Sequence, residues 1–377
     1  MFEDTAAQAR LANPGIVEKD FWVCWTLHRL YSSIPNMPRL LFKGGTSLSK
    51  CFRMIHRFSE DIDLGIERQD IGLVGDLDPM AQSSRNGYQR AVKAMRVKLN
   101  EYGAGTFMPA IEMDFRKALG ETFGLRLEVV GAENVILFKY PRALDASNYG
   151  ADEYVDSVVR LELGARSDHE PVAEVDIRPY VANLFADEFA QQTCSVIAQA
   201  PERTLLEKAL ILHAGICKGR FKERSSRHAY DLAMMHREGT TATVERALYE
   251  QVAHHKFVFG DNPKVRDAPK DGILIVPAGD LLRSLEADYR SMQPMFFTDP
   301  APPAFGEIVA ELTALETALN DLWVNPRPSL PSLLLHSLFA NSVWPCPSSP
   351  KTWSFASNSA PASPKPGPTP TSPPTLA

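Results

Sequence analysis

The chain has 377 residues, of which 44% are hydrophobic and 23% charged, and its formal net charge of −6 gives a pI near 5.9. This composition excludes collagen-like, coiled-coil and wholly disordered proteins. No run of about 18 apolar residues occurs, so we expect no membrane-spanning helix. The first 15 residues lack the basic and apolar regions of a secretory signal. The five cysteines form no CxxC pair, which argues against disulfides and cysteine zinc sites and favours a reducing cytoplasm.

The first part of the chain predicts alternating helices and strands. Apolar residues at helical spacing predict a helix over 16–30, and residues 39–43 predict a short strand. Two glycines end this strand, and a helix follows over 46–55. In 61–66 acidic and apolar side chains alternate, as in a half-buried strand. Residues 85–102 again have a helical period.

The rest of the chain separates into strands, helices and a tail. Four strands are predicted over 125–130, 134–141, 157–165 and 173–180. Helices follow over 202–216, 227–237, 241–256, 279–292 and 305–324, and the first contains the capping-box pattern Thr204-x-x-Glu207. We therefore expect an α+β fold with a mixed-sheet domain in 1–200 and a helical domain in 201–325. Residues 326–377 hold 13 of the 29 prolines, so they predict a tail too poor in core residues to fold.

The strongest chemical signal lies between residues 42 and 66. Glycines at Gly44 and Gly45 let a ligand approach the backbone closely, and the N–H groups of the helix that follows favour a phosphate. Thr46 and Ser47 add hydroxyl donors. These residues predict a phosphate site at the end of the first strand.

Two carboxylates follow on the next strand. Asp61 and Asp63 stand at i and i+2, so both project from one face, and paired oxygen ligands suit Mg²⁺. A complete site needs a third acid. We predict Asp176, in the alternating strand AEVDIRPY, with Glu174 on the same face as the second choice.

A basic segment interrupts the helical half. Residues 218–228 contain five Lys or Arg side chains against one Glu, although the whole chain is acidic. Such a segment is either a solvated loop or a local surface for nucleic acid.

The order Gly44-Gly45, Asp61-x-Asp63 and a later strand carboxylate is the layout of polymerase-β-like nucleotidyltransferases. More specifically, KGGTSLSK, RFSEDIDL, PERTLLEKALILH and RHAYDLAMM resemble motifs of the AbiEii/AbiGii toxin family. EKDFWVCWTL and LEADYRSMQPMFF fit one branch of that family, so the resemblance runs from about residue 16 to 322. The resemblance implies the nucleotidyltransferase fold and an enzyme that transfers a nucleoside monophosphate from an NTP and releases pyrophosphate.

The resemblance also implies roles for individual residues. The segment from Gly44 to Ser47 would cradle the nucleotide phosphates, and Ser59, Asp61 and Asp63 fall on the family's S-x-D-x-D element, whose aspartates would hold Mg²⁺. Lys208 falls on the lysine of the second motif, where it would neutralise the triphosphate. Asp231 falls on the downstream aspartate, preceded by Arg227-His228, where many members have Arg-Asp.

The implied partners are an NTP, an RNA acceptor (most plausibly tRNA) and an antitoxin encoded nearby, in a role such as phage defence. Two alternatives stay open at this point. In the first, the acceptor is a small molecule or a protein instead of RNA. In the second, the chain is a nucleotide-binding module without catalysis. Asp61, Asp63 and Lys208, all present, argue against the last.

Overall fold

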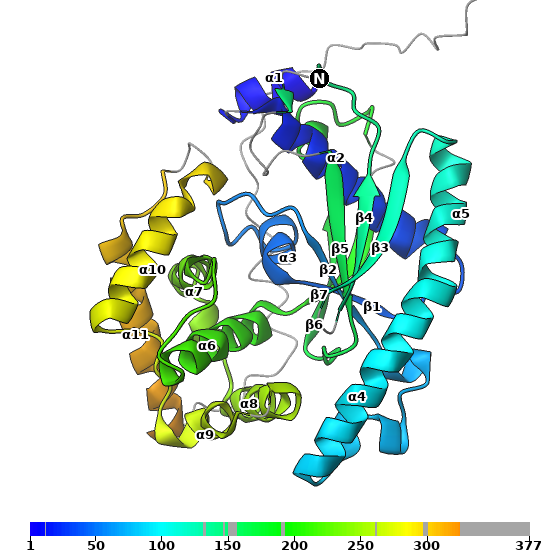
Figure 1. Cartoon of the computed structure of the whole chain (residues 1–377). Helices are drawn as coiled ribbons and strands as arrows, with labels where there is room; N and C mark the ends of the chain where they lie inside the picture. The colour runs from blue at the N-terminus through cyan, green and yellow to red at the C-terminus, as the bar shows by residue number, and fades with distance from the viewer. Residues whose placement is uncertain are drawn as a thin grey trace, which may run out of the picture. The chain divides into compact units, whose positions relative to one another are not determined.

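The computed structural model describes residues 1–11, 13–130, 133–145, 148–149, 157–189, 193–260, 262–296 and 301–324. Met1–Ser332 form one compact unit, shown in Figure 1. The tail predicted for 326–377 lies outside the described residues. None of the described helices combines the length and apolar character that a membrane crossing requires.

A mixed sheet forms the centre of this unit (Figure 1), and within the described residues it has seven strands in the order β3-β4-β5-β2-β1-β7-β6. The strands are β1 (Leu40–Lys43), β2 (Ile62–Ile66), β3 (Gly124–Val130), β4 (Glu133–Lys139), β5 (Val158–Gly164), β6 (Val172–Ile177) and β7 (Cys194–Gln199). Strand β2 pairs antiparallel with β1 and parallel with β5, while β1 pairs parallel with β7. The acidic strand β2 therefore lies in the middle of the sheet, and β6 lies at an edge.

Alternation along the strands gives the sheet one predominantly apolar face. Phe42, Leu64 and Leu161 are fully buried on it, together with Trp25 and Phe115 from helices. The helices concerned are α2 (Pro14–His28), α4 (Arg85–Tyr102) and α5 (Met108–Leu119). Full burial of one such large side chain contributes roughly 1.5–3 kcal/mol, so this packing fixes which face of β2 points away from the core.

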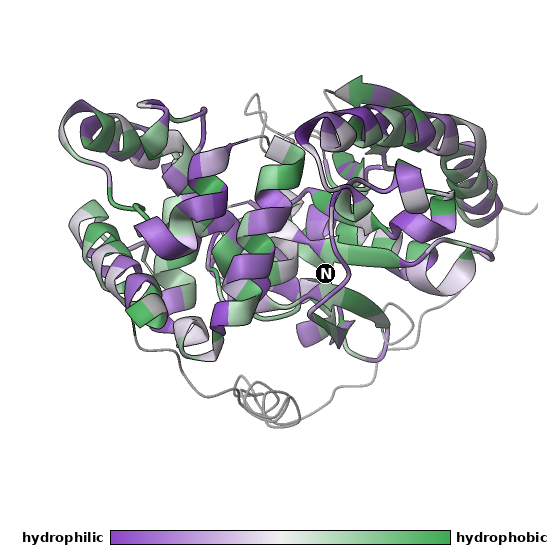
Figure 2. Ribbon diagram, turned by 90° about the horizontal axis from the view of Figure 1, so that it is seen from below, coloured by the Kyte–Doolittle hydropathy of each residue, from purple (hydrophilic) through white to green (hydrophobic). Residues whose placement is uncertain are grey.

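The C-terminal helices bury a second apolar cluster. They are α6 (Pro201–Cys217), α7 (Ser226–Arg237), α8 (Arg246–Gly260), α9 (Pro263–Asp271), α10 (Gly279–Ser291) and α11 (Phe305–Val324). Leu48 of α3 (Gly44–Lys50) belongs to this cluster, so α3 joins the sheet to the helices. Figure 2 shows both polar and apolar segments along the helices, as expected for helices that pack on one side.

The predicted elements in the described residues are present, with some differences. The patterns missed α1 (Phe2–Gln8), α5, β7 and α9. The capping-box prediction was wrong, because α6 begins at Pro201 rather than beyond Thr204. The Thr204 hydroxyl instead donates to the Ala200 carbonyl at 3.4 Å and lies 3.1 Å from Gln199 Nε2. The helix predicted for 241–256 begins at Arg246, after a short 3₁₀ turn at Thr240–Thr243.

Candidate active site

The turn between β1 and α3 leaves no room for a side chain. Gly44 has a φ of +82°, and a Cβ there would lie 1.8 Å from Asp63 Oδ2. A Cβ on Gly45 would lie 2.6 Å from Arg57 Nη2 and 2.8 Å from Ser59 Oγ. Glycine is required at both positions, because the backbone here lies directly against an acidic and a basic group.

The two hydroxyls predicted to bind phosphate are engaged within the chain. Thr46 Oγ1 donates to the Asp61 carbonyl at 2.5 Å and lies 3.0 Å from Ser59 Oγ. Ser47 Oγ donates to the Gly44 carbonyl at 3.0 Å, and both side chains are buried. These bonds hold the glycine turn against the segment that leads into β2. In this geometry, each of the two hydroxyls donates to a backbone carbonyl instead of pointing to a phosphate.

The predicted pair of carboxylates stands on the polar face of the sheet. Asp61 directly precedes β2, and Asp63 lies within it, opposite Lys43 of β1. On the other side, Asp63 is the register partner of Glu162 in β5. Directly opposite residues point to the same face, so Asp63 and Glu162 are neighbours there. Burial and then the nearby Glu162 charge raise the pKa of Asp61, which shows how closely negative charge is gathered.

The structure does not bring the predicted third acid, Asp176, to Asp61 and Asp63. Asp176 lies on the edge strand β6, opposite Ser195, and β7 and β1 separate it from β2. Neighbouring strands are about 4.8 Å apart, which places Asp176 roughly 14 Å from the Asp63 strand. Glu174, the second choice, lies on the same strand and accepts from Ser195 Oγ at 2.9 Å. Both residues lie away from Asp63, which the sequence could not show because strand order is not encoded in local alternation.

Glu162 is the residue that the sequence reasoning missed. It is half-buried, and Arg160 Nε donates to it at 2.8 Å. The signal was present, because Arg160 and Glu162 are charged at i and i+2 in an otherwise apolar strand. That is the same pattern that identified Asp61 and Asp63.

A buried ion cluster joins the turn to the helical half. Asp231 of α7 is fully buried and accepts from Arg57 Nε at 2.8 Å and from Arg57 Nη2 at 2.9 Å. Lys208 of α6 lies 2.9 Å from the same carboxylate. Burial alone would raise the pKa of Asp231, but Arg57 and then Lys208 outweigh it and hold that pKa well below its usual range. The structure thus brings the predicted Lys208 and Asp231 together, and Arg57, which had not been predicted, connects them to Gly45.

Arg227 and His228 stand one turn before Asp231 on the same helix. Burial and the Lys208 charge lower the pKa of His228 to about 3, so its imidazole is neutral near pH 7. Burial, Arg57 and Arg224 also lower the pKa of Arg227, while Asp61 opposes this shift. The Arg227 charge is therefore close enough to Asp61 to be felt there, which links α7 to the carboxylates.

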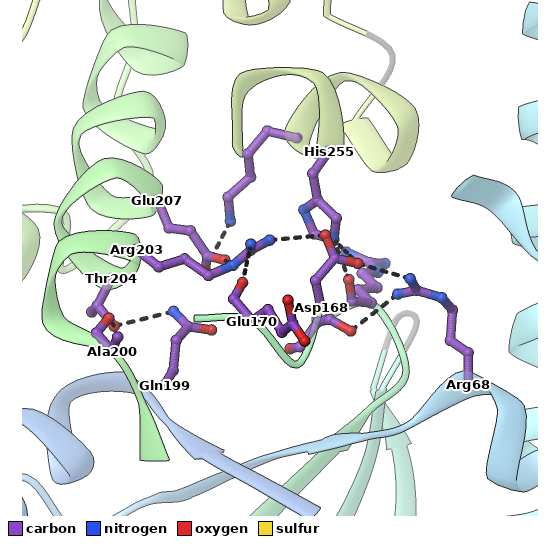
Figure 3. Close-up of polar contacts among 12 residues, drawn as sticks. Arg68, Asp168, Glu170, Gln199, Ala200, Arg203, Thr204, Glu207 and His255 are labelled. Carbon is purple, nitrogen blue, oxygen red and sulfur yellow. Dashed lines mark hydrogen bonds and ion pairs between the residues drawn. The ribbon is translucent and has the colours of Figure 1, made fainter. Parts of the chain in front are cut away.

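A second polar network fixes the loop after β5 (Figure 3). Arg203 of α6 is fully buried, donates to the Glu170 carbonyl at 2.7 Å and lies 3.1 Å from Asp168. Arg68 approaches Asp168 from the other side at 2.7 Å, and Glu207 lies 3.4 Å from Arg203 Nε. This network ties β5, and with it the strand of Glu162, to helix α6.

Comparison with known families shows to which family the chain belongs. The model of the family "Nucleotidyl transferase AbiEii toxin, Type IV TA system" matches residues 25–311, which is most of the chain. The chain belongs to this family. It is accordingly a nucleotidyltransferase of the AbiEii toxin type.

Other comparisons add little to this assignment. Among solved structures, MenT4, a nucleotidyltransferase toxin from Mycobacterium tuberculosis H37Rv, matches with 16% identity and a TM-score of 0.41. The match covers 85% of this chain and 99% of that one, and such a distant likeness carries no argument about single residues. No curated protein matches.

The AbiEii family implies a divalent cation, and the residues here suit Mg²⁺ by type. Asp61, Asp63 and Glu162 offer carboxylate oxygens, the ligands that Mg²⁺ prefers, on neighbouring strands and one face. Burial first and then the Glu162 charge raise the pKa of Asp61, and a cation would relieve this repulsion. Among the described residues no three acidic, His or Cys side chains are already gathered as a metal site.

Proposed function

We propose that this AbiEii-type chain is a Mg²⁺-dependent enzyme that transfers a nucleoside monophosphate from an NTP to an RNA, most plausibly tRNA. The observation that carries the proposal is that Asp63 lies directly against the Gly44-Gly45 turn, with Glu162 as its register partner. A phosphate cradle and two carboxylates thus occupy one place, as nucleotidyl transfer requires.

In the proposed reaction the Gly44-Gly45 backbone orients the triphosphate. Lys208 and Arg57 keep positive charge beside the turn. Mg²⁺ held by Asp61, Asp63 and Glu162 would neutralise charge on the phosphate oxygens. A hydroxyl of the acceptor attacks the α-phosphorus in line, the bond to the β-phosphate oxygen breaks, and pyrophosphate leaves. Glu162 replaces Asp176 as the candidate that takes the hydroxyl proton, because it lies beside Asp63.

The basic segment supports RNA as the acceptor. Lys218, Arg220 and Lys222 are exposed, so they are available to phosphates, and Arg224 is exposed at the end of the same segment. The loop is held in place because the Asp288 carboxylate accepts from the backbone N–H of Arg224 at 3.1 Å and of Ser226 at 2.7 Å. The Arg224 charge acts on Glu60, the residue before Asp61, which places this end of the segment near the carboxylates.

The family suggests a partner and a biological role for this chain. A type IV toxin–antitoxin family implies an antitoxin, which we propose is encoded nearby, and we propose a cytoplasmic role in defence against phage. We also propose that residues 1–200 and 201–325 act as two lobes, since the sheet and the C-terminal helices each bury a cluster of their own, with Leu48, Met54 and Ile55 of the first part packed into the helical cluster.

The test is nucleotide transfer by purified protein with Mg²⁺, each α-labelled NTP in turn and total tRNA. We expect label on tRNA that is lost in Asp61→Asn/Asp63→Asn. Glu162→Gln and Asp176→Asn form a matched pair. We expect the rate of nucleotide transfer to fall at least 100-fold for Glu162→Gln and less than twofold for Asp176→Asn. Equal effects of the two substitutions would refute the assignment of Glu162.

Two outcomes would favour the alternatives. Mg²⁺-dependent NTP binding without label on tRNA indicates a small-molecule or protein acceptor. In that case RNA binding should lack the steep salt dependence that phosphate contacts produce. NTP binding that survives the loss of both Asp61 and Asp63 indicates a module without catalysis.

A further inference from the structure

Helix α2 carries three consecutive charged residues that are buried although none of them belongs to the proposed site. The exposed fractions of Glu18, Lys19 and Asp20 are 0%, 4% and 5%. Buried charges persist only when they are paired. Successive side chains on a helix point about 100° apart, so the three contact different parts of the molecule.

Lys19 contacts the segment that leads to the carboxylates. Its ammonium forms an ion pair with Glu60, the residue immediately before Asp61. Lys19 also acts on Asp61 itself, since its charge favours the ionised form of that carboxyl. Lys19 therefore offsets the repulsion between Glu60 and Asp61 and fixes the chain where it enters β2.

Asp20 contacts the far end of the helix that begins at the glycine turn. Its Oδ1 accepts from Lys50 Nζ at 2.6 Å, and Oδ2 accepts from the Tyr180 N–H at 2.6 Å. Lys50 is the last residue of α3, and its Nζ lies 3.8 Å from the centre of the Tyr180 ring. Because α3 is only two turns long, the position of Lys50 determines where Gly44 and Gly45 lie.

Glu18 points elsewhere and provides an internal comparison. Its Oε1 accepts from the Ala143 N–H at 2.6 Å, and its other oxygen accepts from the Tyr149 hydroxyl. Neither contact involves the glycine turn, β2 or the ion cluster of Asp231. Glu18 is as buried as its two neighbours, but among the described residues its hydrogen bonds do not lead to the site.

We propose that Lys19 and Asp20 are positioning residues that set the two halves of the active site separately. Lys19 places the carboxylates through Glu60, and Asp20 places the phosphate cradle through Lys50. This inference rests on the proposed function, because it assigns Mg²⁺ to one half and the triphosphate to the other. It predicts that substitutions at neighbouring positions of one helix have different effects on the two ligands.

The experiment measures equilibrium binding of an NTP at graded Mg²⁺ concentrations, together with urea unfolding, for three variants. For Lys19→Met we expect at least a fivefold rise in the Mg²⁺ concentration for half-maximal binding, with the NTP Kd at saturating Mg²⁺ unchanged within twofold. For Asp20→Asn we expect the NTP Kd at saturating Mg²⁺ to rise at least fivefold, with the Mg²⁺ concentration for half-maximal binding unchanged within twofold. For Glu18→Gln we expect a lower unfolding midpoint but neither change in binding.

Double variants separate positioning from folding. Lys19→Met/Glu60→Gln and Asp20→Asn/Lys50→Met remove both members of an ion pair, so they should recover stability relative to the single variants. If positioning is the role, their binding defects persist. Binding that recovers together with stability, or single-variant defects that simply follow lost stability, would overturn the inference. Absence of Mg²⁺-dependent NTP binding in the unaltered chain would overturn the proposed function and the inference with it, whereas normal binding by both single variants would overturn only the inference.

Discussion

Replacing Asp231 by Asn tests the buried ion cluster that joins α7 to the glycine turn. The side-chain exposures of Arg57, Asp231 and Lys208 are 4%, 0% and 9%, so water cannot replace the lost partner. Arg57 would keep one contact outside the pair, the 3.2 Å bond from Nη1 to the Phe58 carbonyl. Removing one partner of a buried ion pair costs about 3–5 kcal/mol. Since the free energy of unfolding of a domain is only about 5–15 kcal/mol, we expect Asp231→Asn to remove a large part of it.

The assay is urea unfolding at pH 7, followed by tryptophan fluorescence. Asp176→Asn is the matched control, because this aspartate is exposed on the edge strand, and we expect it to change stability by less than about 0.5 kcal/mol. A loss below about 1 kcal/mol for Asp231→Asn would refute the reasoning that the cluster is held by charge.

The same cluster predicts a pH dependence. The pKa of Asp231 is lowered in the folded protein from its usual value of 3.8. Its ionised form therefore contributes stability that is fully present above that value and is lost as the pH falls toward the lower, folded value. The stability difference between the unaltered chain and Asp231→Asn should stay constant above pH 5 and shrink below about pH 4.

Three further predictions concern the turn, the histidine and the loop network. Gly44→Ala should abolish Mg²⁺-dependent NTP binding, because its Cβ would lie 1.8 Å from Asp63 Oδ2 at a φ of +82°; binding within twofold of the unaltered chain would contradict this. Because burial and Lys208 lower the pKa of His228 to about 3, its imidazole NMR signals should not titrate between pH 5 and 8. A titration midpoint near 6.5 would show that the ring is neither buried nor close to the Lys208 charge. Arg203→Met should destabilise the protein by about 3 kcal/mol in urea, because it leaves Asp168 and Glu207 with fewer partners; a cost near zero would mean that Arg68 alone holds the loop.

Local patterns predicted most of the elements, although not α1, α5, β7 and α9, and they located the glycine turn and the strand of Asp63. The alternation in 61–66 located β2, and the glycine pair located the turn, because both depend on neighbours in the chain. Helical spacing found α2, α4 and α6 for the same reason. The motifs around Gly44, Asp61 and Lys208 were long enough to indicate the AbiEii family, which the family comparison confirmed.

The tertiary structure decided everything that depends on strand order and on contacts far apart in the chain. Glu162 and Asp176 occur in similar alternating strands, and only the order β5-β2-β1-β7-β6 puts the first beside Asp63 and the second at an edge. The same holds for Arg57, which meets Asp231 across 174 positions of sequence. Local sequence determines which way a side chain faces on its own strand or helix. Which residues then become neighbours is set by the packing of whole elements, and for that reason the acid opposite Asp63 was visible only in the folded chain.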